Sequence, residues 1–147
     1  MLTYENSVQF VLDQPAPVSL RNFFPPENGF IWSSSHWSEI TFEFSATPAS
    51  RKKSAKLMLD FDVFKMAGHI DGQDVFIYLN GLRVGSHFET QRTTLAIPVD
   101  AKMLKSGGNV LTFDTPDTKR PSEFGIPDER QLGIQLFGMQ IRPTDES

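Results

Sequence analysis

The sequence contains no cysteine, and this absence narrows the chemistry open to the chain. Without thiols the protein forms no disulfide bonds and offers no thiolate ligand to a metal ion. A cysteine-free chain fits a reducing compartment, so we expect a cytoplasmic location. No stretch approaches the roughly 20 apolar residues of a membrane helix, and the N-terminal MLTYENSVQFVLDQ lacks the pattern of a signal peptide. We therefore expect no membrane insertion.

An excess of positive charge is also missing. The 147 residues carry a formal net charge of −4, with acidic and basic residues interspersed. Proteins that bind nucleic acids usually present a basic face to the phosphates. The charge balance therefore predicts no nucleic-acid partner.

Catalytic and cofactor motifs are absent as well. None of the three histidines, His36, His69 and His87, lies in a recognisable nucleophile or zinc motif. The sequence has no Gly-x-Ser-x-Gly and no phosphate-binding loop. We expect a non-enzyme without a cofactor, because a small domain lacking such signatures is more often a binding protein.

Helical periodicity is nearly absent, whereas strict alternation of apolar and polar residues is frequent. EITFEFS and KLMLDFDVF alternate, with these side chains on their apolar faces: Ile40, Phe42, Phe44, Leu57, Leu59, Phe61 and Val63. DVFIYLNGLRVGS reaches Asn80-Gly81, a pair typical of a tight hairpin turn. TTLAIPVD, NVLTFDT and IQLFGMQI read as further strands, with a bulge at Gly138, while SVQFVL and PVSL are weaker candidates.

This pattern predicts one all-β domain over residues 1–147, built as an antiparallel β-sandwich or jelly roll of about eight strands. One short helical turn is expected after Asp100, which would cap it. Residues 143–147 form a polar tail that we expect to be frayed.

Two long segments interrupt the strands. They are residues 21–37, RNFFPPENGFIWSSSHW, and residues 114–133, DTPDTKRPSEFGIPDERQLG. Long irregular segments in a compact domain are usually either functional or disordered, and their aromatic content argues against disorder. Both segments are therefore candidates for a functional site.

Four motifs in a fixed order carry a resemblance to a known family. They are Pro26-Glu27, Trp32-Ser33, Asn80-Gly81 and Asp128-x-Arg130-x-Leu132-Gly133, within residues 23–141. The chain resembles a β-sandwich accessory domain of bacterial glycosyltransferases and surface-polysaccharide proteins. It is more loosely similar to the galactose-binding-like jelly rolls of carbohydrate-binding modules. The resemblance implies a non-catalytic carbohydrate-binding or accessory domain of bacterial glycan metabolism, with a glycan or a glycosyltransferase as partner, and transfers no catalytic residue.

Asp128 and Arg130 allow two interpretations. Side chains two residues apart on an extended segment share a face, and an Arg fork can hold a carboxylate with two hydrogen bonds. The favoured interpretation is that Arg130 pairs with Asp128 or with Glu27, so that it fastens the two long segments together. Leu132 would then enter the core, and Gly133 would let the backbone pass close. The alternative is that these charged groups bind sugar hydroxyls.

GFIWSSSHW carries the residue types that suit a sugar. Aromatic rings stack on the C–H faces of sugars, and short polar side chains bind the hydroxyls, so Trp32, Ser33 and His36 are candidate contacts. The alternative is that one tryptophan lies in the core and the other covers the end of the sandwich, since tryptophan is usually well buried. We expect Trp32 to be more exposed than Trp37, which directly precedes a strand.

Two other places are weaker candidates. Asp71 and Asp74 lie near a glycine turn and offer oxygen ligands of the kind calcium prefers, although an ordinary hairpin loop is the favoured interpretation. LRVGSHFETQR offers Arg83, His87, Phe88 and Arg92 as part of a binding face, but an exposed hairpin with ordinary surface charges is favoured there too.

Two further function classes remain open. Met58, Phe76 and Tyr78 are large residues at outward positions, and they favour a protein-interaction or homo-oligomerisation module. Register reversal would instead place some of them in the core. A small jelly-roll hydrolase is the third alternative, and it would need a pocket with a perturbed carboxylate or histidine.

Overall fold

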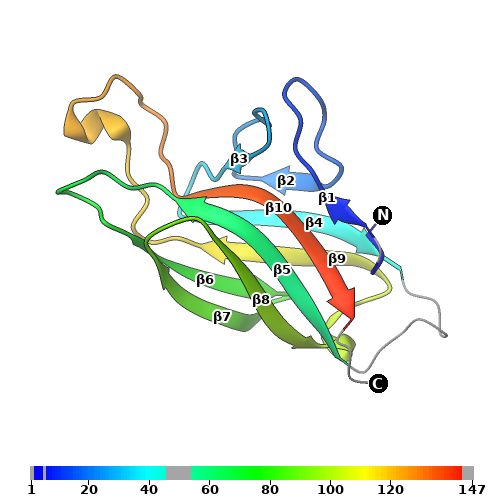
Figure 1. Ribbon diagram of the computed structural model, residues 1–147. Helices are drawn as coiled ribbons and strands as arrows, with labels where there is room; N and C mark the ends of the chain where they lie inside the picture. Colours follow the sequence, from blue (N-terminus) through cyan, green and yellow to red (C-terminus); the bar gives the residue numbers. More distant parts are fainter. Residues whose placement is uncertain (1, 5, 46–53, 144–147) are drawn as a thin grey trace.

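Two antiparallel sheets packed face to face form the molecule (Figure 1). The computed structural model describes residues 2–4, 6–45 and 54–143, and these residues contain ten strands and two 3-10 helices. The predicted all-β antiparallel sandwich is confirmed. Three of the ten strands have only two or three residues, too few to show an alternating pattern. Ser7–Val8 and Ser19–Arg21 fall on the weaker candidates SVQFVL and PVSL, and Ile31–Trp32 was not predicted.

The first sheet, which we call the β10 sheet, runs in the order β1–β10–β5–β8, and β3 pairs with the same edge of β10 as β1. Its strands are β1 (Ser7–Val8), β3 (Ile31–Trp32), β5 (Ser54–Val63), β8 (Thr93–Asp100) and β10 (Ile134–Pro143). In Figure 1 its outer face is turned toward the viewer.

The second sheet, the β9 sheet, runs in the order β2–β4–β9–β6–β7. Its strands are β2 (Ser19–Arg21), β4 (Trp37–Phe44), β6 (Gln73–Leu79), β7 (Leu82–Glu89) and β9 (Gly107–Asp114). The 3-10 helices are η1 (Ala101–Met103) and η2 (Pro121–Phe124). Helix η2 lies in the second long segment, and the sequence did not predict it.

The core lies between the two sheets, where the alternating apolar side chains meet. All the inward residues expected from β4 and β5 are buried, and Phe61 and Phe113 are among the largest side chains with no exposed surface. Alternation therefore predicted the inner faces correctly, because burying one face of each strand is what fixes its register.

The two local turn predictions are confirmed. Asn80 and Gly81 both have positive φ, 50° and 86°, as a tight hairpin turn requires. The Asn80 side chain also holds the turn in place. Its Nδ2 donates to the carbonyl of Met103 at 2.8 Å, and its Oδ1 accepts from the N–H of Val110 at 2.8 Å. Asp100 caps η1 by accepting from the N–H of Lys102.

The predicted bulge lies in β10. Its register with β5 shifts between Leu136 and Gly138, so that Phe137 and Gly138 together face Asp60. Leu136 and Met139 are both buried, although they are three residues apart. The bulge leaves Phe137 on the outer face, beside the Asp60 of the neighbouring strand.

The predictions for the large outward residues and for the C-terminal tail need correction. Phe76 and Tyr78 lie on the outer face of the β9 sheet, whereas Met58 lies on the outer face of the β10 sheet, so the three residues form no common surface. Pro143, assigned to the frayed tail, is the last residue of β10 and pairs with Ala55. The rest of the predicted tail, 144–147, lies outside the described residues. Within the described ranges, no helix has the length and apolar character needed to cross a membrane.

Candidate functional site

Arg130 joins the two long segments. Its Nε and Nη2 donate to the Asp128 carboxylate at 3.1 and 2.9 Å. Its Nη1 lies 3.5 Å from Oε2 of Glu27 in the first long segment. The guanidinium carbon also lies 5.6 Å from the centre of the Phe24 ring. We call Glu27, Asp128 and Arg130 the Arg130 lock.

The charges of the lock stabilise one another. Hydrogen bonds from the Arg130 side chain and N–H lower the pKa of Asp128, and Asp128 in turn raises the pKa of Arg130. Oε2 of Glu27 is buried and has no hydrogen-bond partner among the described residues. The ion pair with Arg130 therefore offsets the loss of hydration at this oxygen. The geometry matches the fastening interpretation. A sugar contact by these three residues stays a prediction.

The backbone after the lock is tightly enclosed. Leu132 is buried in the interior, as expected. A Cβ at Gly133 would lie 2.5 to 2.7 Å from side-chain atoms of Thr118, Thr115 and Ser33, so only glycine fits there. This is the close backbone approach that the sequence predicted.

Ser33 is a correction to the predicted sugar contacts. Its side chain has no exposed surface, and its Oγ accepts a hydrogen bond from the N–H of Ile134 at 2.9 Å. A side chain enclosed in this way has no atom to offer a ligand. Its position follows from the pairing of β3 with β10, which the sequence did not reveal.

The expected order of tryptophan exposure is wrong. Trp37 is 41% exposed, because it begins β4 on the outer side of the β9 sheet. Trp32 is only partly exposed and packs edge-on against Phe30, with ring centres 6.4 Å apart. His36 is exposed, and its carbonyl accepts from the N–H of Thr115 at 2.6 Å.

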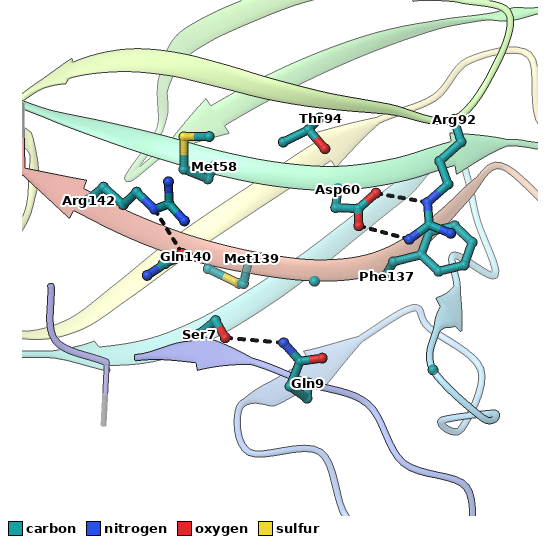
Figure 2. Close-up of a pocket in the computed structure, with 12 residues that line it drawn as sticks. Ser7, Gln9, Met58, Asp60, Arg92, Thr94, Phe137, Met139, Gln140 and Arg142 are labelled. Atoms are coloured by element: carbon teal, nitrogen blue, oxygen red, sulfur yellow. Dashed lines mark hydrogen bonds and ion pairs between the residues drawn. The ribbon is translucent and has the colours of Figure 1, made fainter. Parts of the chain in front are cut away.

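A groove of about 470 Å³ lies on the outer face of the β10 sheet (Figure 2). It crosses β1, β10, β5 and the start of β8, and Gly29 of the first long segment contributes to its rim. The side chains that matter below are Gln9, Asp60, Arg92, Phe137, Gln140 and Arg142. The sequence predicted none of these as a sugar contact, although Arg92 belonged to the hairpin considered as a binding face.

Arg92 dominates one end of the groove. Its Nε and Nη2 donate to the two oxygens of Asp60 at 3.0 and 2.9 Å. Its guanidinium carbon lies over the Phe137 ring, 3.6 Å from the ring centre. The hydrogen bond to Asp60 is the largest cause of a raised Arg92 pKa. We call Asp60, Arg92 and Phe137 the Arg92 clamp.

A run of aromatic rings links the clamp to the predicted Trp32. Phe137 lies 5.7 Å from Phe30, and Phe30 lies 6.4 Å from Trp32, measured between ring centres. Trp32 pairs with Gln135, which places it on the same outer face as Phe137. The predicted tryptophan is therefore part of the wall that leads to the groove.

Amides and a second arginine occupy the rest of the groove. Arg142 donates from Nε to Oε1 of Gln140 at 3.0 Å, and Gln9 donates from Nε2 to Oγ of Ser7 at 3.1 Å. Figure 2 shows these side chains along β10 and β1, away from the clamp. The two amides can both donate and accept hydrogen bonds, and the arginine can donate them, so this floor is suited to hydroxyl groups.

The groove gives little support to hydrolysis or to calcium. Asp60 is the one carboxylate among its described lining residues, whereas glycoside hydrolysis usually needs a pair. Asp71 and Asp74 are exposed, and within the described ranges no three His, Cys, Asp or Glu side chains are placed to hold a metal ion. The calcium alternative therefore lacks a ligand set.

Similarity to solved structures is found at the level of the fold. The chain is similar to a family 35 carbohydrate binding module from Clostridium thermocellum, with a TM-score of 0.52, 13% identity, and coverage of 95% of this chain and 99% of the module. It is also similar to a GH26-CBM35 β-(1,4)-mannanase from Podospora anserina, with a TM-score of 0.55, 14% identity, and coverage of 96% of this chain and 28% of the mannanase.

A family GH115 4-O-methyl-α-glucuronidase gives a TM-score of 0.51 and 9% identity, over 93% of this chain and 17% of that protein. The chain thus spans nearly all of the isolated module but a minor part of the two enzymes. No protein-family model matches the sequence, and comparison with curated proteins gives no significant match. At identities this low the likeness shows the fold alone.

Proposed function

We propose that the protein is a non-catalytic carbohydrate-binding domain and that the groove on the β10 sheet holds the glycan. The observation that carries this proposal is the composition of the groove: the Arg92 clamp and amide side chains line one open cavity, and the rings of Phe30 and Trp32 continue outward from Phe137 of its lining. An open groove suits a chain molecule that enters from the side. The fold neighbour described as a carbohydrate binding module supports the same function by analogy.

Each part of the groove has a separate task in this proposal. Arg92 uses two of its five N–H bonds on Asp60, so three remain for oxygen atoms of a ligand. Gln9 and Gln140 bind hydroxyls along the floor. Phe30 and Trp32 provide C–H contacts at the rim, while one face of Phe137 is already occupied by Arg92.

A glycan-array screen of the purified chain tests the proposal. Trp32→Ala and Gln140→Ala are the test variants, and Trp37→Ala on the opposite sheet is the matched control. We expect binding that weakens in both test variants and persists in the control. Binding to no glycan would overturn the function, and binding lost only in Trp37→Ala would move the site to the β9 sheet.

A second candidate function is protein docking through the outer face of the β9 sheet. The observation that favours it is Trp37, which lies 5.7 Å from Tyr78 between ring centres and is 41% exposed. Large exposed aromatic side chains are enriched at protein interfaces. The partner could be a glycosyltransferase, as the resemblance implies, or a second copy of the chain. Sedimentation of the wild type and of Trp37→Ala separates self-association from a monomer.

The remaining expectations stay predictions. They are the link to bacterial polysaccharide metabolism, the cytoplasmic location and the assignment of residues 1–147 to a single domain. Fractionation of cells that express the full-length protein, with detection in each fraction, would test the location.

A further inference from the structure

We propose that the groove selects a glycan bearing an anionic group, held at the end formed by Arg142 and Lys56. This inference rests on the proposed function and names the class of glycan. The chain as a whole is acidic, with a net charge of −4, yet the charged residues lining the groove are two arginines and one aspartate. The groove is therefore a local positive region on an acidic protein.

The two arginines differ in how their charge is balanced. Arg92 makes two hydrogen bonds with Asp60, so its positive charge is matched by a negative one. Arg142 donates to Gln140, which is neutral, and it has no acidic partner within ion-pair distance among the described residues. The clamp end therefore favours neutral hydroxyls, whereas at the Arg142 end the positive charge is not matched by any carboxylate of the described residues.

Lys56 adds a second cation at that end. It lies on β5 directly opposite Arg142, and both residues are exposed on the outer face. Like charges at directly opposed positions of neighbouring strands destabilise a sheet. No described carboxylate forms an ion pair with Lys56 either. An anion bound between the two side chains would remove this repulsion, which gives the ligand a physical reason to prefer the position.

The spacing sets the shape of the ligand. Asp60 and Lys56 are four residues apart on β5, and a strand rises roughly 3.3 Å per residue, so the two ends are roughly 13 Å apart. That span corresponds to a short oligosaccharide. The inferred ligand therefore presents neutral hydroxyls to the clamp and a carboxylate, sulfate or phosphate ester about 13 Å away.

Matched glycan pairs that differ only in charge test the inference. The probes are oligogalacturonate with its methyl ester, for a carboxylate, and dextran sulfate oligosaccharide with dextran, for a sulfate. Titration calorimetry gives the affinity of each, at low and at physiological salt. We expect at least one charged member to bind about tenfold or more tightly than its neutral counterpart, with a preference that falls as salt rises.

Three variants assign the preference to the site. Arg142→Gln and Lys56→Gln remove the cations one at a time, and Arg83→Gln removes an exposed cation of β7 in the other sheet. The preference is the affinity of the charged glycan divided by that of its neutral counterpart. We expect Arg142→Gln and Lys56→Gln to bring this ratio close to one, and Arg83→Gln to leave it unchanged. All three positions are exposed, so the thermal midpoint serves as a check that each variant folds.

The outcomes separate this inference from the proposed function. Neutral glycans bound in the groove without a preference for charge would overturn the anionic inference and leave the function standing. A preference that Arg83→Gln reduces as much as Arg142→Gln would show adsorption to the surface as a whole, and it would also overturn the inference. Binding to no glycan, neutral or charged, would overturn both.

Discussion

The Arg130 lock and the Arg92 clamp use the same chemistry in two regions of the molecule. Each arginine donates from its Nε and Nη2 to one aspartate, and each guanidinium lies near a phenylalanine ring. The surroundings differ. Arg130 also reaches the buried oxygen of Glu27, whereas Arg92 stands at the end of an open groove with 54% of its side chain exposed.

This difference shows that a set of contacts does not by itself decide a role. The lock closes on a second carboxylate of the same chain, because Nη1 of Arg130 pairs with Glu27. The clamp leaves three N–H bonds unused by Asp60, on a side chain that lines the cavity. We therefore expect the lock to contribute to stability and the clamp to contribute to binding.

The largest expected effect concerns the glycine that follows the lock. In Gly133→Ala the new Cβ would lie 2.5 to 2.7 Å from three buried side-chain atoms, and such overpacking costs about 1–3 kcal/mol or more. Gly138→Ala, beside the clamp, is the matched control, because its nearest atom would be the carbonyl oxygen of Val8 at 3.3 Å. Urea unfolding of the two variants measures the difference. Equal midpoints would contradict the contrast between a closed and an open region.

The next effect is on the lock itself. Arg130→Met removes the ion-pair partner of Glu27. Both side chains are more than a third exposed, so water replaces part of the lost interaction and we expect a cost of roughly 0.2–1 kcal/mol in the free energy of unfolding. Adding Glu27→Gln should recover part of this loss, and a double-mutant cycle measures the coupling between the two residues. Additive losses would show that the 3.5 Å ion pair contributes nothing.

A substitution in the Arg92 clamp is expected to weaken glycan binding and to leave stability nearly unchanged, the reverse of a substitution in the Arg130 lock. Arg92→Met removes donors from the groove, and we expect the glycan Kd to rise about tenfold, the loss typical of one net hydrogen bond. The urea midpoint should stay close to that of the wild type, since the side chain is exposed. Calorimetric titration of Arg92→Met beside Arg130→Met checks both statements, and a Kd raised equally in both variants would contradict the division of roles.

The smallest expected effect is on the dependence of stability on pH. Because Arg130 lowers the pKa of folded Asp128, folded Asp128 binds fewer protons than unfolded Asp128 at acid pH, and protonation favours unfolding. The stabilisation is complete above the ordinary carboxyl pKa of about 3.9 and is lost as pH falls through the lowered value. Urea midpoints of the wild type and Asp128→Asn should therefore converge at low pH. A constant difference at every pH would contradict this.

The lock was accessible to sequence reasoning, and the clamp was not. Asp128 and Arg130 are two residues apart, so their shared face follows from the extended backbone alone. Arg92 and Asp60 are 32 residues apart and meet through the pairing of β5 with β8. No local pattern carries that register. The same limit explains Ser33, whose burial depends on the pairing of β3 with β10.

The strands themselves were predictable where one face is buried. Alternation identified the inner faces of β4 and β5, because a slip of one residue would exchange core and solvent faces. It could not tell which of the two outer faces a residue lies on, and this is why Met58 was grouped with Phe76 and Tyr78. The order of tryptophan exposure failed for a related reason: Trp37 begins β4 at an outward position.

The bulge in β10 changes the outer surface of the strand and leaves the buried side unchanged. Removing Gly138 from the sequence would give unbroken alternation, with Leu136, Met139 and Ile141 still on the buried side. The interior would thus accept a strand that is one residue shorter. The extra residue lies in the lining of the groove, next to Phe137. Gly138 therefore behaves as a one-residue insertion in β10. Insertions of this kind change the shape of the groove and require no substitution of the buried residues.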